Sequence, residues 1–293
     1  MIYNKDDMAD QKTLVFIGAH PDDESFGIGG TLAKYALEGV KVHYIVATRG
    51  EAGEVNPSLM ANFTSLGDLR WSELQCAARV LGLTSVIWLG YRDSGMRGSH
   101  DNAHPQALMN APLDEVAGRI VKILRELKPQ VVITFDPMGG YNHPDHVAVH
   151  RATVKAFYAA GDASQYPDAG EPFQPQKLYL SIFPRGLLKI TVKLMPLWGQ
   201  NPRKLGKNQD IDLASVANVN YPVHAIVRLN KQALELKDKA VACHASQLGE
   251  GRPRRGWLFA LADKFIRRRD LFMRAYPPVK NRRKEKDLFA GLK

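Results

Sequence analysis

The stretch TLVFIGAHPDDES, residues 13–25, joins an apolar run directly to a group of charged side chains. The apolar run TLVFIG predicts a buried strand, and the helix-period pattern that follows over 25–38 ends at Gly39. The same alternation recurs along the chain, with strands predicted at 40–48, 85–90 and 130–136 and helices at 66–81 and 113–127. Alternating strands and helices predict an α/β fold: a Rossmann-like, mostly parallel sheet with helices on both faces.

The pattern loosens after Ala160. We expect a loop-rich insertion near 161–215 that contains one strand at 177–183, followed by a strand at 221–229 and a helix at 231–246. The predicted organisation is one α/β domain over 1–251, with this insertion, and a basic helical C-terminal extension over 252–293.

The net charge of +10 lies entirely in that extension. Residues 252–293 hold 14 Lys/Arg and 4 Asp/Glu, so residues 1–251 are neutral overall and exert no net attraction on polyanions. Aromatic residues are not regularly interleaved with the basic ones, as a base-stacking surface requires. We expect a solvated helical face that is dispensable for activity. RNA, an acidic membrane surface or a partner protein is the alternative ligand for this segment.

The sequence contains no run of about 18 apolar residues, and its polar start MIYNKDDMADQK lacks the apolar core of a secretory signal. We therefore expect a cytoplasmic protein without a membrane span. Its two cysteines, Cys76 and Cys243, are too few for a disulfide framework or a cysteine-ligated zinc site. Because both lie in helix-like segments, we expect plain buried side chains that fill the core.

Two polar clusters each follow a predicted strand and open a helix. Ligands bind outside the carboxyl ends of the strands in an open α/β sheet, so the two clusters can converge there. Together they supply six side chains: His20, Asp22, Asp23, His143, Asp145 and His146. Imidazole and carboxylate without thiolate suit Zn²⁺ or Fe²⁺, and a catalytic site needs about three protein ligands with one position open.

We assign His20, Asp23 and His146 as the metal ligands. The i, i+3 spacing of the first two, across one proline, turns both inward on a single bend, while Asp22 is offset and reaches a bound water instead. A second triplet would use His150, which shares a helix face with His146 at i, i+4. We rank that triplet lower, because His150 lies one turn inside the helix and away from the strand ends.

Three other interpretations of these motifs fit less well. Histidine and carboxylate side chains can cap loops without any chemistry, but here both clusters follow strands. The glycines of GIGG, residues 27–30, come after the residues that start the helix and lack the G-x-G-x-x-G order of dinucleotide-binding loops. Ser25 lacks the flanking glycines of a G-x-S-x-G nucleophile elbow.

The motifs AHPDDE (19–24) and GGYNHPDH (139–146) together resemble the PIG-L/LmbE family of metal-dependent N-deacetylases. Four further segments resemble the family in the same order: TRGEAGE (48–54), LRWSELQCAARVLG (69–82), GYRDSGM (90–96) and HASQ (244–247). The resemblance covers about two thirds of the chain. It is nearest to the branch that contains the glucosaminyl-inositol deacetylase and the mycothiol conjugate amidase, and it makes 1–251 the deacetylase-like catalytic domain.

The resemblance implies the same three metal ligands and adds roles for their neighbours. Asp22 would be the general base that takes the proton of the attacking water. Tyr141 would point its hydroxyl at the developing oxyanion, and a protonated His143 would stabilise charge or act as the acid. Asp145 would hold the imidazole of His143 in orientation, as a carboxylate behind a catalytic ring does.

Substrate recognition rests on fewer signals. The resemblance implies that Arg70 and Asp93 hydrogen-bond sugar hydroxyls, and Arg49 follows a strand in a way that brings it near the crevice rim. It also favours His244 near the site. Glu24 has no assigned role, because an acidic residue there simply favours the positive end of the following helix.

The function predicted from the sequence is metal-dependent hydrolysis of the N-acyl amide, in particular an N-acetyl amide, of a glucosamine-containing small molecule. The first alternative is an amidase of larger thiol or sugar conjugates. The distant alternative is a module that binds anionic polymers through its basic extension. The expected partner is the small N-acyl amino sugar, with neither nucleic acid nor a membrane span involved.

Overall fold

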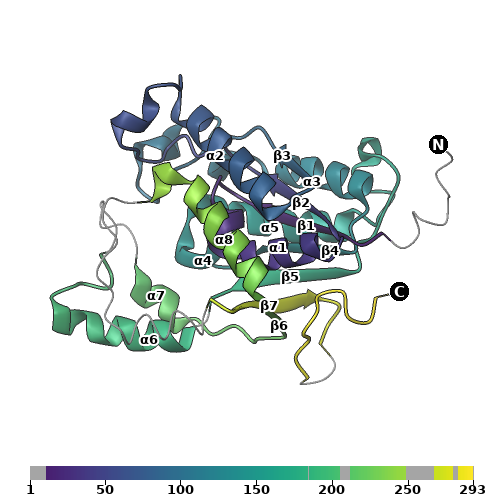
Figure 1. The fold of residues 1–293 in the computed structure, drawn as a ribbon. Helices are drawn as coiled ribbons and strands as arrows, with labels where there is room; N and C mark the ends of the chain where they lie inside the picture. Colours follow the sequence, from purple (N-terminus) through teal and green to yellow (C-terminus); the bar gives the residue numbers. More distant parts are fainter. Residues whose placement is uncertain (1–10, 184, 205–211, 249–266, 280–282, 293) are drawn as a thin grey trace.

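The computed structural model describes residues 11–183, 185–204, 212–248, 267–279 and 283–292 (Figure 1). Within these residues a seven-stranded sheet has the order β3-β2-β1-β4-β5-β7-β6. Its strands are β1 (Thr13–Gly18), β2 (Lys41–Val46), β3 (Ser85–Trp88), β4 (Val131–Phe135), β5 (Lys177–Ile182), β6 (Ala225–Arg228) and β7 (Arg269–Tyr276). Neighbours from β3 to β5 are parallel, and β7 runs antiparallel to both β5 and β6. The predicted α/β class with a mostly parallel sheet is confirmed.

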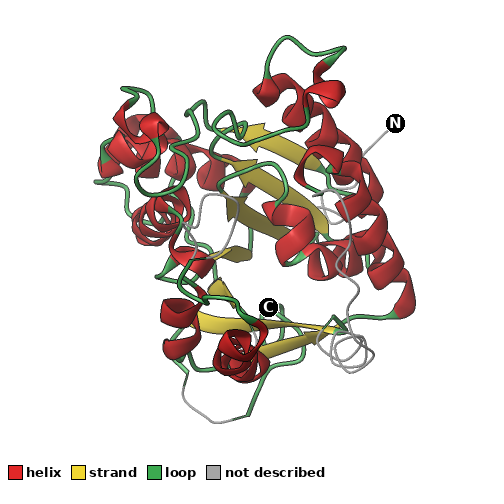
Figure 2. Cartoon of the chain, turned by 90° about the vertical axis from the view of Figure 1, so that its left-hand side faces the viewer, coloured by secondary structure: helices red, strands yellow, loops and turns green. Residues whose placement is uncertain are grey.

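Helices cover both faces of the sheet (Figure 2). One face packs against α1 (Gly29–Leu37), α2 (Leu66–Leu81) and α8 (Lys231–Cys243), and the other against α3 (Leu113–Leu127) and α5 (Pro144–Ala159). Strand β1 shows why its sequence is apolar throughout. Val15 and Ile17 enter the core below α3 and α5, whereas Leu14 and Phe16 enter the core below α1, so every position of the strand is buried.

Local signals placed several helix ends correctly. Ser65 caps α2 by accepting a hydrogen bond from the backbone N–H of Asp68, and Gly82 ends the helix in the left-handed region with φ 74°. Helix α1, in contrast, begins at Gly29 and not at residue 25. Residues Asp23–Gly27 form a single π-helical turn, η2, which holds the first polar cluster away from the helix.

The strand order reverses direction at β1, because β2 lies on one side of it and β4 on the other. Ligand crevices in open α/β sheets form at such a point, outside the carboxyl ends of the strands. The backbone is closely packed there. A Cβ atom on Gly18 would lie 2.5 Å from the Tyr44 hydroxyl oxygen, and that hydroxyl donates to the carbonyl of His20 at 2.7 Å. The last residue of β1 must therefore be glycine for the turn to sit over β2.

The loop-rich character expected near 161–215 is wrong for the second half of that range, in the part that the structure describes. The segment contains α6 (Arg185–Leu194), the 3₁₀ turn η7 (Met195–Trp198) and α7 (Leu213–Asn218). Pro196 lies in the first turn of η7, where its missing N–H costs no helical hydrogen bond. Helix α7 contacts α4 (Gly139–Asn142), so this insertion adjoins the second polar cluster.

The helical extension expected over 252–293 is also wrong where it can be compared. Residues 269–276 form β7, which lies inside the sheet between β5 and β6, while residues 252–266 lie outside the described part. Asp270 and Phe272 alternate with more exposed neighbours, a period of two that the basic composition obscured. Beyond β7, Leu288 and Phe289 are buried in the core under α1, so the segment is more than a solvated face.

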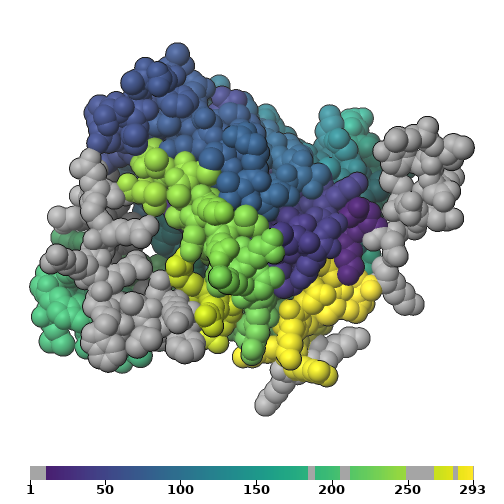
Figure 3. Space-filling model, in the orientation of Figure 1, coloured from purple at the N-terminus to yellow at the C-terminus, as the bar shows by residue number. Residues whose placement is uncertain are grey.

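Cys76 and Cys243 form a disulfide, which corrects the expectation that they are plain core-filling side chains. They lie 167 residues apart in sequence, on α2 and α8, and only the packing of these helices brings their Cα atoms to 5.8 Å. The two helices adjoin on the molecular surface (Figure 3). Among the described residues, the search for a helix long and apolar enough to cross a membrane finds none.

Candidate metal centre and active site

Two segments far apart in sequence meet at the carboxyl end of the sheet. The turn after β1 carries His20 and Asp23, and the start of α5 carries His143, Asp145 and His146. All three histidines are at least nine-tenths buried. The convergence expected of the two polar clusters is therefore present, and it brings both imidazole and carboxylate to one place.

The three side chains assigned as ligands lie at metal-ligand spacing. Nδ1 of His20 is 3.2 Å from Nε2 of His146, and that Nε2 is 3.4 Å from Oδ1 of Asp23. The nearer Asp23 oxygen to Nδ1 of His20, Oδ2, is 3.9 Å away. Ligands about 2.0–2.1 Å from a tetrahedral ion are separated by about 3.3 Å. The donor set and two of its three spacings thus fit a tetrahedral ion such as Zn²⁺.

Two further groups of candidate ligand atoms share His20. One joins it to His143 and His146, and the other to Asp93 and Asp145. The second group lies on the opposite edge of the His20 ring, because Nε2 is 3.2 Å from Asp145 and 3.4 Å from Asp93. A carboxylate behind a ligand histidine fixes its tautomer and orientation. We therefore interpret Asp93 and Asp145 as groups that orient His20 and leave Nδ1 for the metal.

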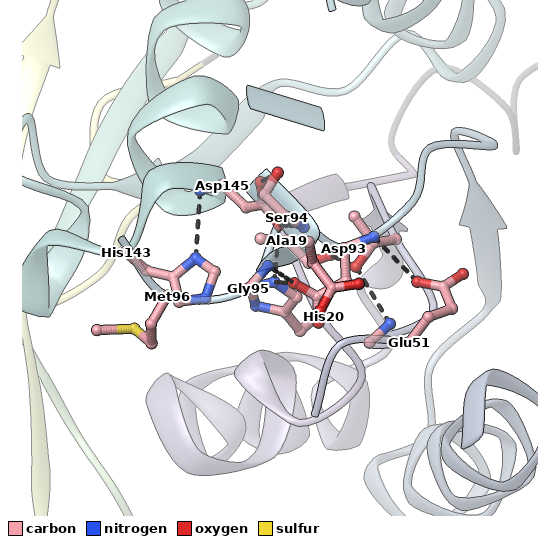
Figure 4. Close-up of polar contacts among 12 residues, drawn as sticks. Ala19, His20, Glu51, Asp93, Ser94, Gly95, Met96, His143 and Asp145 are labelled. Carbon is pink, nitrogen blue, oxygen red and sulfur yellow. Dashed lines mark hydrogen bonds and ion pairs between the residues drawn. The ribbon is translucent and has the colours of Figure 1, made fainter. Parts of the chain in front are cut away.

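This geometry corrects the role expected for Asp145. Its carboxylate does not hold His143; it contacts His20 and accepts hydrogen bonds from the Ser94 hydroxyl and, at 2.9 Å, from the Ser94 backbone N–H. Figure 4 shows these side chains around His20. The contact between the two residues runs through the backbone instead, since the Asp145 N–H donates to Nδ1 of His143 at 3.2 Å, at the N-terminus of α5.

Asp93 is also deeper than expected for a sugar-binding residue at the crevice rim. It is buried, its carboxylate accepts a hydrogen bond from Gly95, and its backbone N–H donates to Glu51 at 3.0 Å. Burial raises the pKa of Asp93, but the charge and hydrogen bond of His20 outweigh it and hold that pKa well below the usual range. Asp93 therefore carries a negative charge that faces His20.

Asp22 lies beside the ligands and outside the metal triplet, as expected of a base. Its carboxylate accepts a hydrogen bond from Nη2 of Arg70 at 3.1 Å. Burial raises the pKa of Asp22 to about 7, although the positive charge of Arg70 acts in the opposite direction. A carboxyl group with such a pKa can both accept and return a proton near neutral pH.

Arg70 is a buried part of the site and not a surface ion-pair partner. Besides Asp22, its guanidinium donates to the carbonyls of Pro21 (2.8 Å) and Gly50 (3.0 Å). A Cβ atom on Gly50 would lie 2.1 Å from the guanidinium, so glycine makes room for it. Arg49, expected at the rim, instead stacks its guanidinium over the rings of Trp71 and Trp88 and pairs with Asp68. Its Nε has no hydrogen-bond partner among the described residues.

The aromatic rings of the second cluster, those of Tyr141, His143 and His146, contact one another beside the proposed ligands. The Tyr141 ring lies 5.1 Å from the His146 ring and 5.9 Å from the His143 ring, centre to centre. Burial raises the pKa of Tyr141 well above its usual range, so its hydroxyl keeps its proton. Burial, and the charge of His20 when that ring is protonated, lower the pKa of His143 well below its usual range, which favours a neutral His143 ring over the protonated ring expected. Because Nδ1 of His143 accepts a hydrogen bond, the ring proton lies on Nε2.

His150 faces away from the cluster, with Nδ1 2.8 Å from the carbonyl oxygen of Phe135, so the lower-ranked triplet is not supported. Ser94 and Glu51 were missed by the sequence analysis, although both lie in segments that resemble the family. No local spacing rule marks them, because each acts on a residue from another loop.

Fold and site together define a class of protein: a Rossmann-like α/β enzyme with a histidine–carboxylate centre at the carboxyl ends of its strands. The family model described as PIG-L, GlcNAc-PI de-N-acetylase, matches residues 15–157. A protein of Streptomyces scabiei named 1D-myo-inositol 2-acetamido-2-deoxy-alpha-D-glucopyranoside deacetylase is 36% identical, over 95% of this chain and 89% of its own. The chain belongs to the PIG-L family.

Solved structures show how widely the fold is shared. N,N'-diacetylchitobiose deacetylase from Pyrococcus horikoshii superimposes with a TM-score of 0.62 at 23% identity, over 92% of this chain and 86% of that one. The 4-carboxy-2-hydroxymuconate hydratase GalB from Pseudomonas putida superimposes with a TM-score of 0.58 at 18% identity, over 92% and 99%. Since one neighbour is a deacetylase and the other a hydratase, the reaction must be argued from the site and not from the fold.

Proposed function

We propose that this chain is a metal-dependent N-deacetylase that hydrolyses the acetamide of a glucosamine-containing small molecule. The observation that carries the proposal is the meeting of His20, Asp23 and His146, with two of their three spacings suited to a tetrahedral ion and Asp22 next to Asp23 in the chain. The family and the names of the relatives support the same reaction class.

The ligand side chains would hold Zn²⁺, or Fe²⁺, which suits the same donors. When bound, the ion supplies Lewis-acid chemistry, lowering the pKa of a water molecule and polarising the amide carbonyl. Asp23 would keep its orientation because its second oxygen, Oδ2, accepts hydrogen bonds from the backbone N–H groups of Ala19 and His20. Asp93 and Asp145 would keep Nδ1 of His20 directed at the ion.

The remaining groups divide the proton transfers and the charge stabilisation. Asp22 takes the proton of the attacking water, and Arg70 stabilises the carboxylate form from which it does so. Tyr141 and the Nε2–H of neutral His143 are donors for the oxyanion that develops on the carbonyl. Once the C–N bond breaks, the proton held by Asp22 is available to the leaving amine.

For the substrate, we propose the compound in the relatives' name, 1D-myo-inositol 2-acetamido-2-deoxy-α-D-glucopyranoside. The extent of the similarity supports this substrate, because the alignment spans nearly all of both chains and therefore includes the loops that surround the site. Arg49 stays a predicted sugar-binding residue: its side chain is 29% exposed, and its Nε has no hydrogen-bond partner among the described residues.

The test is release of primary amine from a panel of substrates by protein reconstituted separately with Zn²⁺ and Fe²⁺. We expect the inositol glycoside to be the best substrate, a chelator to abolish turnover, and the metal to restore it. Preference for a larger thiol conjugate of the same sugar would favour the amidase alternative. Turnover that survives complete metal removal would refute the proposal.

Metal content tests the ligands independently of turnover. Replacement of His20 or His146 by alanine should lower the bound metal per chain sharply, since each supplies one of three protein bonds. His150→Ala is the matched control and should keep full occupancy. Full occupancy in His146→Ala would refute the ligand set.

A further inference from the structure

Asp22 has a backbone conformation that its neighbours must maintain. Its φ of 131° and ψ of −27° lie in a region that residues with a side chain rarely adopt. Such a conformation costs of the order of 1–3 kcal/mol and persists only where the surroundings fix it from several sides. Arg70 binds the side chain of Asp22 and the carbonyl before it, but neither contact holds the Asp22 backbone N–H.

Glu24 holds that N–H. Its Oε2 accepts a hydrogen bond from the backbone N–H of Asp22 at 3.0 Å, two residues back along the chain. Its Oε1 accepts from the Ser25 hydroxyl at 2.6 Å and contacts Nε2 of His244 at 2.7 Å. Glu24 is fully buried, so both oxygens are satisfied by the protein and their directions are fixed.

His244 supplies the contact that comes from far along the chain. It is fully buried, and its other ring nitrogen, Nδ1, has no hydrogen-bond partner among the described residues. The contact with Glu24 is therefore the hydrogen bond that orients the His244 ring. Burial lowers the pKa of His244, but the hydrogen bond and charge of Glu24 outweigh it and raise that pKa above the usual value. Removing one member of this buried, hydrogen-bonded pair leaves the other without its partner, which is costly.

The end of α8 that carries His244 is tied to α2 twice. Cys243 is disulfide-bonded to Cys76, and Glu73 of α2 accepts hydrogen bonds from the backbone and hydroxyl of Ser246, at 2.7 and 2.6 Å. The same helix carries Arg70. Helix α2 thus reaches Asp22 by two routes: directly through Arg70, and through α8, His244 and Glu24.

We propose that Glu24 and His244 are positioning residues that keep Asp22 in its strained, catalytically competent conformation, with the Cys76–Cys243 disulfide fixing the helix end that carries His244. The inference rests on the proposed function of Asp22 as the general base. It does not involve the metal ligands, because Asp23 is held by other hydrogen bonds, from Ala19 and His20.

The principal variant is His244→Leu, compared with His244→Gln, whose side-chain amide can replace the Nε2 donor. His244→Leu should lower kcat about 10-fold to 100-fold, because small displacements of a catalytic group have effects of that size. KM should stay within about twofold and metal content should be unchanged. His244→Gln should recover most of the lost kcat.

The control is Thr31→Val, which removes another buried hydrogen bond to a carboxylate, the 2.6 Å contact with Asp270 between α1 and β7. It should lower thermal stability and leave kcat per folded molecule unchanged. If His244→Leu does not fold, Cys243→Ser tests the same tether and should lower kcat by a smaller factor, because it leaves the contact between Glu24 and His244 in place. Unchanged kcat in every folded variant, loss of metal in His244→Leu, or no recovery in His244→Gln would each overturn the inference.

Hydrogen exchange of the peptide that spans 19–28 separates this inference from the proposed function. In the wild-type protein the N–H groups of Ser25 and Phe26 donate to the Asp22 carbonyl, at 2.9 and 2.8 Å, and should exchange slowly. His244→Leu should speed their exchange, whereas Thr31→Val should not. Faster exchange in a protein inactive on every substrate would refute the proposed function alone; unchanged exchange in His244→Leu would refute the positioning.

Discussion

Replacement of Phe289 by alanine should remove a large part of the stability of this protein, although the residue lies in the basic segment that the sequence marked as dispensable. Its side chain is 4% exposed and packs edge-on against the ring of Tyr35 at 5.4 Å. The loss expected for a buried phenylalanine is about 3–5 kcal/mol. That is a large fraction of the roughly 5–15 kcal/mol by which single domains are stable.

The measurement is urea denaturation followed by circular dichroism, with Lys286→Ala as the matched control. Lys286 lies in the same segment but is exposed, so its replacement should change the free energy of unfolding by less than about 0.5 kcal/mol. A free energy of unfolding for Phe289→Ala within about 1 kcal/mol of the wild-type value would show that residues 285–292 are not part of the core.

Truncation after Pro278 should be more damaging than the point variant. It also removes Glu285, which pairs with the buried ammonium of Lys177 at 2.8 Å, and the carbonyl of Ala290, which accepts from the same ammonium at 2.7 Å. An uncompensated buried charge costs about 3–5 kcal/mol. Adding Lys177→Met to the truncated chain should therefore recover part of the stability, and a further loss instead would contradict this account.

Three other predictions concern the site and its supports. Asp22→Asn should keep the metal and lower kcat about 10²-fold to 10⁴-fold, whereas Asp23→Asn should lose metal; the reverse pattern, by elemental analysis and kinetics, would exchange their roles. Reduction of the disulfide, or Cys243→Ser, should lower the free energy of unfolding by up to about 5 kcal/mol, since the bond closes a loop of 167 residues. Two titratable thiols in the unreduced protein would show that the disulfide does not form. Arg125→Met should cost at least about 3 kcal/mol, because its buried guanidinium donates to six backbone carbonyls between 159 and 170 and each buried acceptor left without a donor costs about 1–3 kcal/mol. A melting temperature no lower than that of the exposed control Arg79→Met would refute it.

The sequence by itself determined the α/β class, the β1-to-β4 half of the sheet and the two polar clusters that meet at the site. These follow from local information. An apolar strand buried on both faces must be apolar throughout, as in 13–18, and a helix such as α2 has its own capping serine and terminal glycine. The i, i+3 spacing of His20 and Asp23 depends only on one turn, and the rule for strand ends brings the second cluster to the same edge.

Only the tertiary structure decided which carboxylate orients which histidine ring of the site. Asp145 was expected to hold His143 two residues away, but the turn at the start of α5 directs its carboxylate to His20 and Ser94, from two other loops. Contacts of this kind depend on the distance between segments in space. The packing of the sheet and its helices sets that distance. Local sequence patterns carry no information about the distance between remote segments.

The same reason explains the errors at the C-terminal end. Basic residues in 267–276 indicated a solvated helix, yet β5 leaves an edge with unpaired backbone groups, and pairing with β7 satisfies them. The disulfide required α2 and α8 to lie side by side, 167 residues apart in the chain. Local sequence thus indicated the elements from β1 to α5 and the polar residues of the site, while strand pairing and helix packing determined the partners that hold those residues in place.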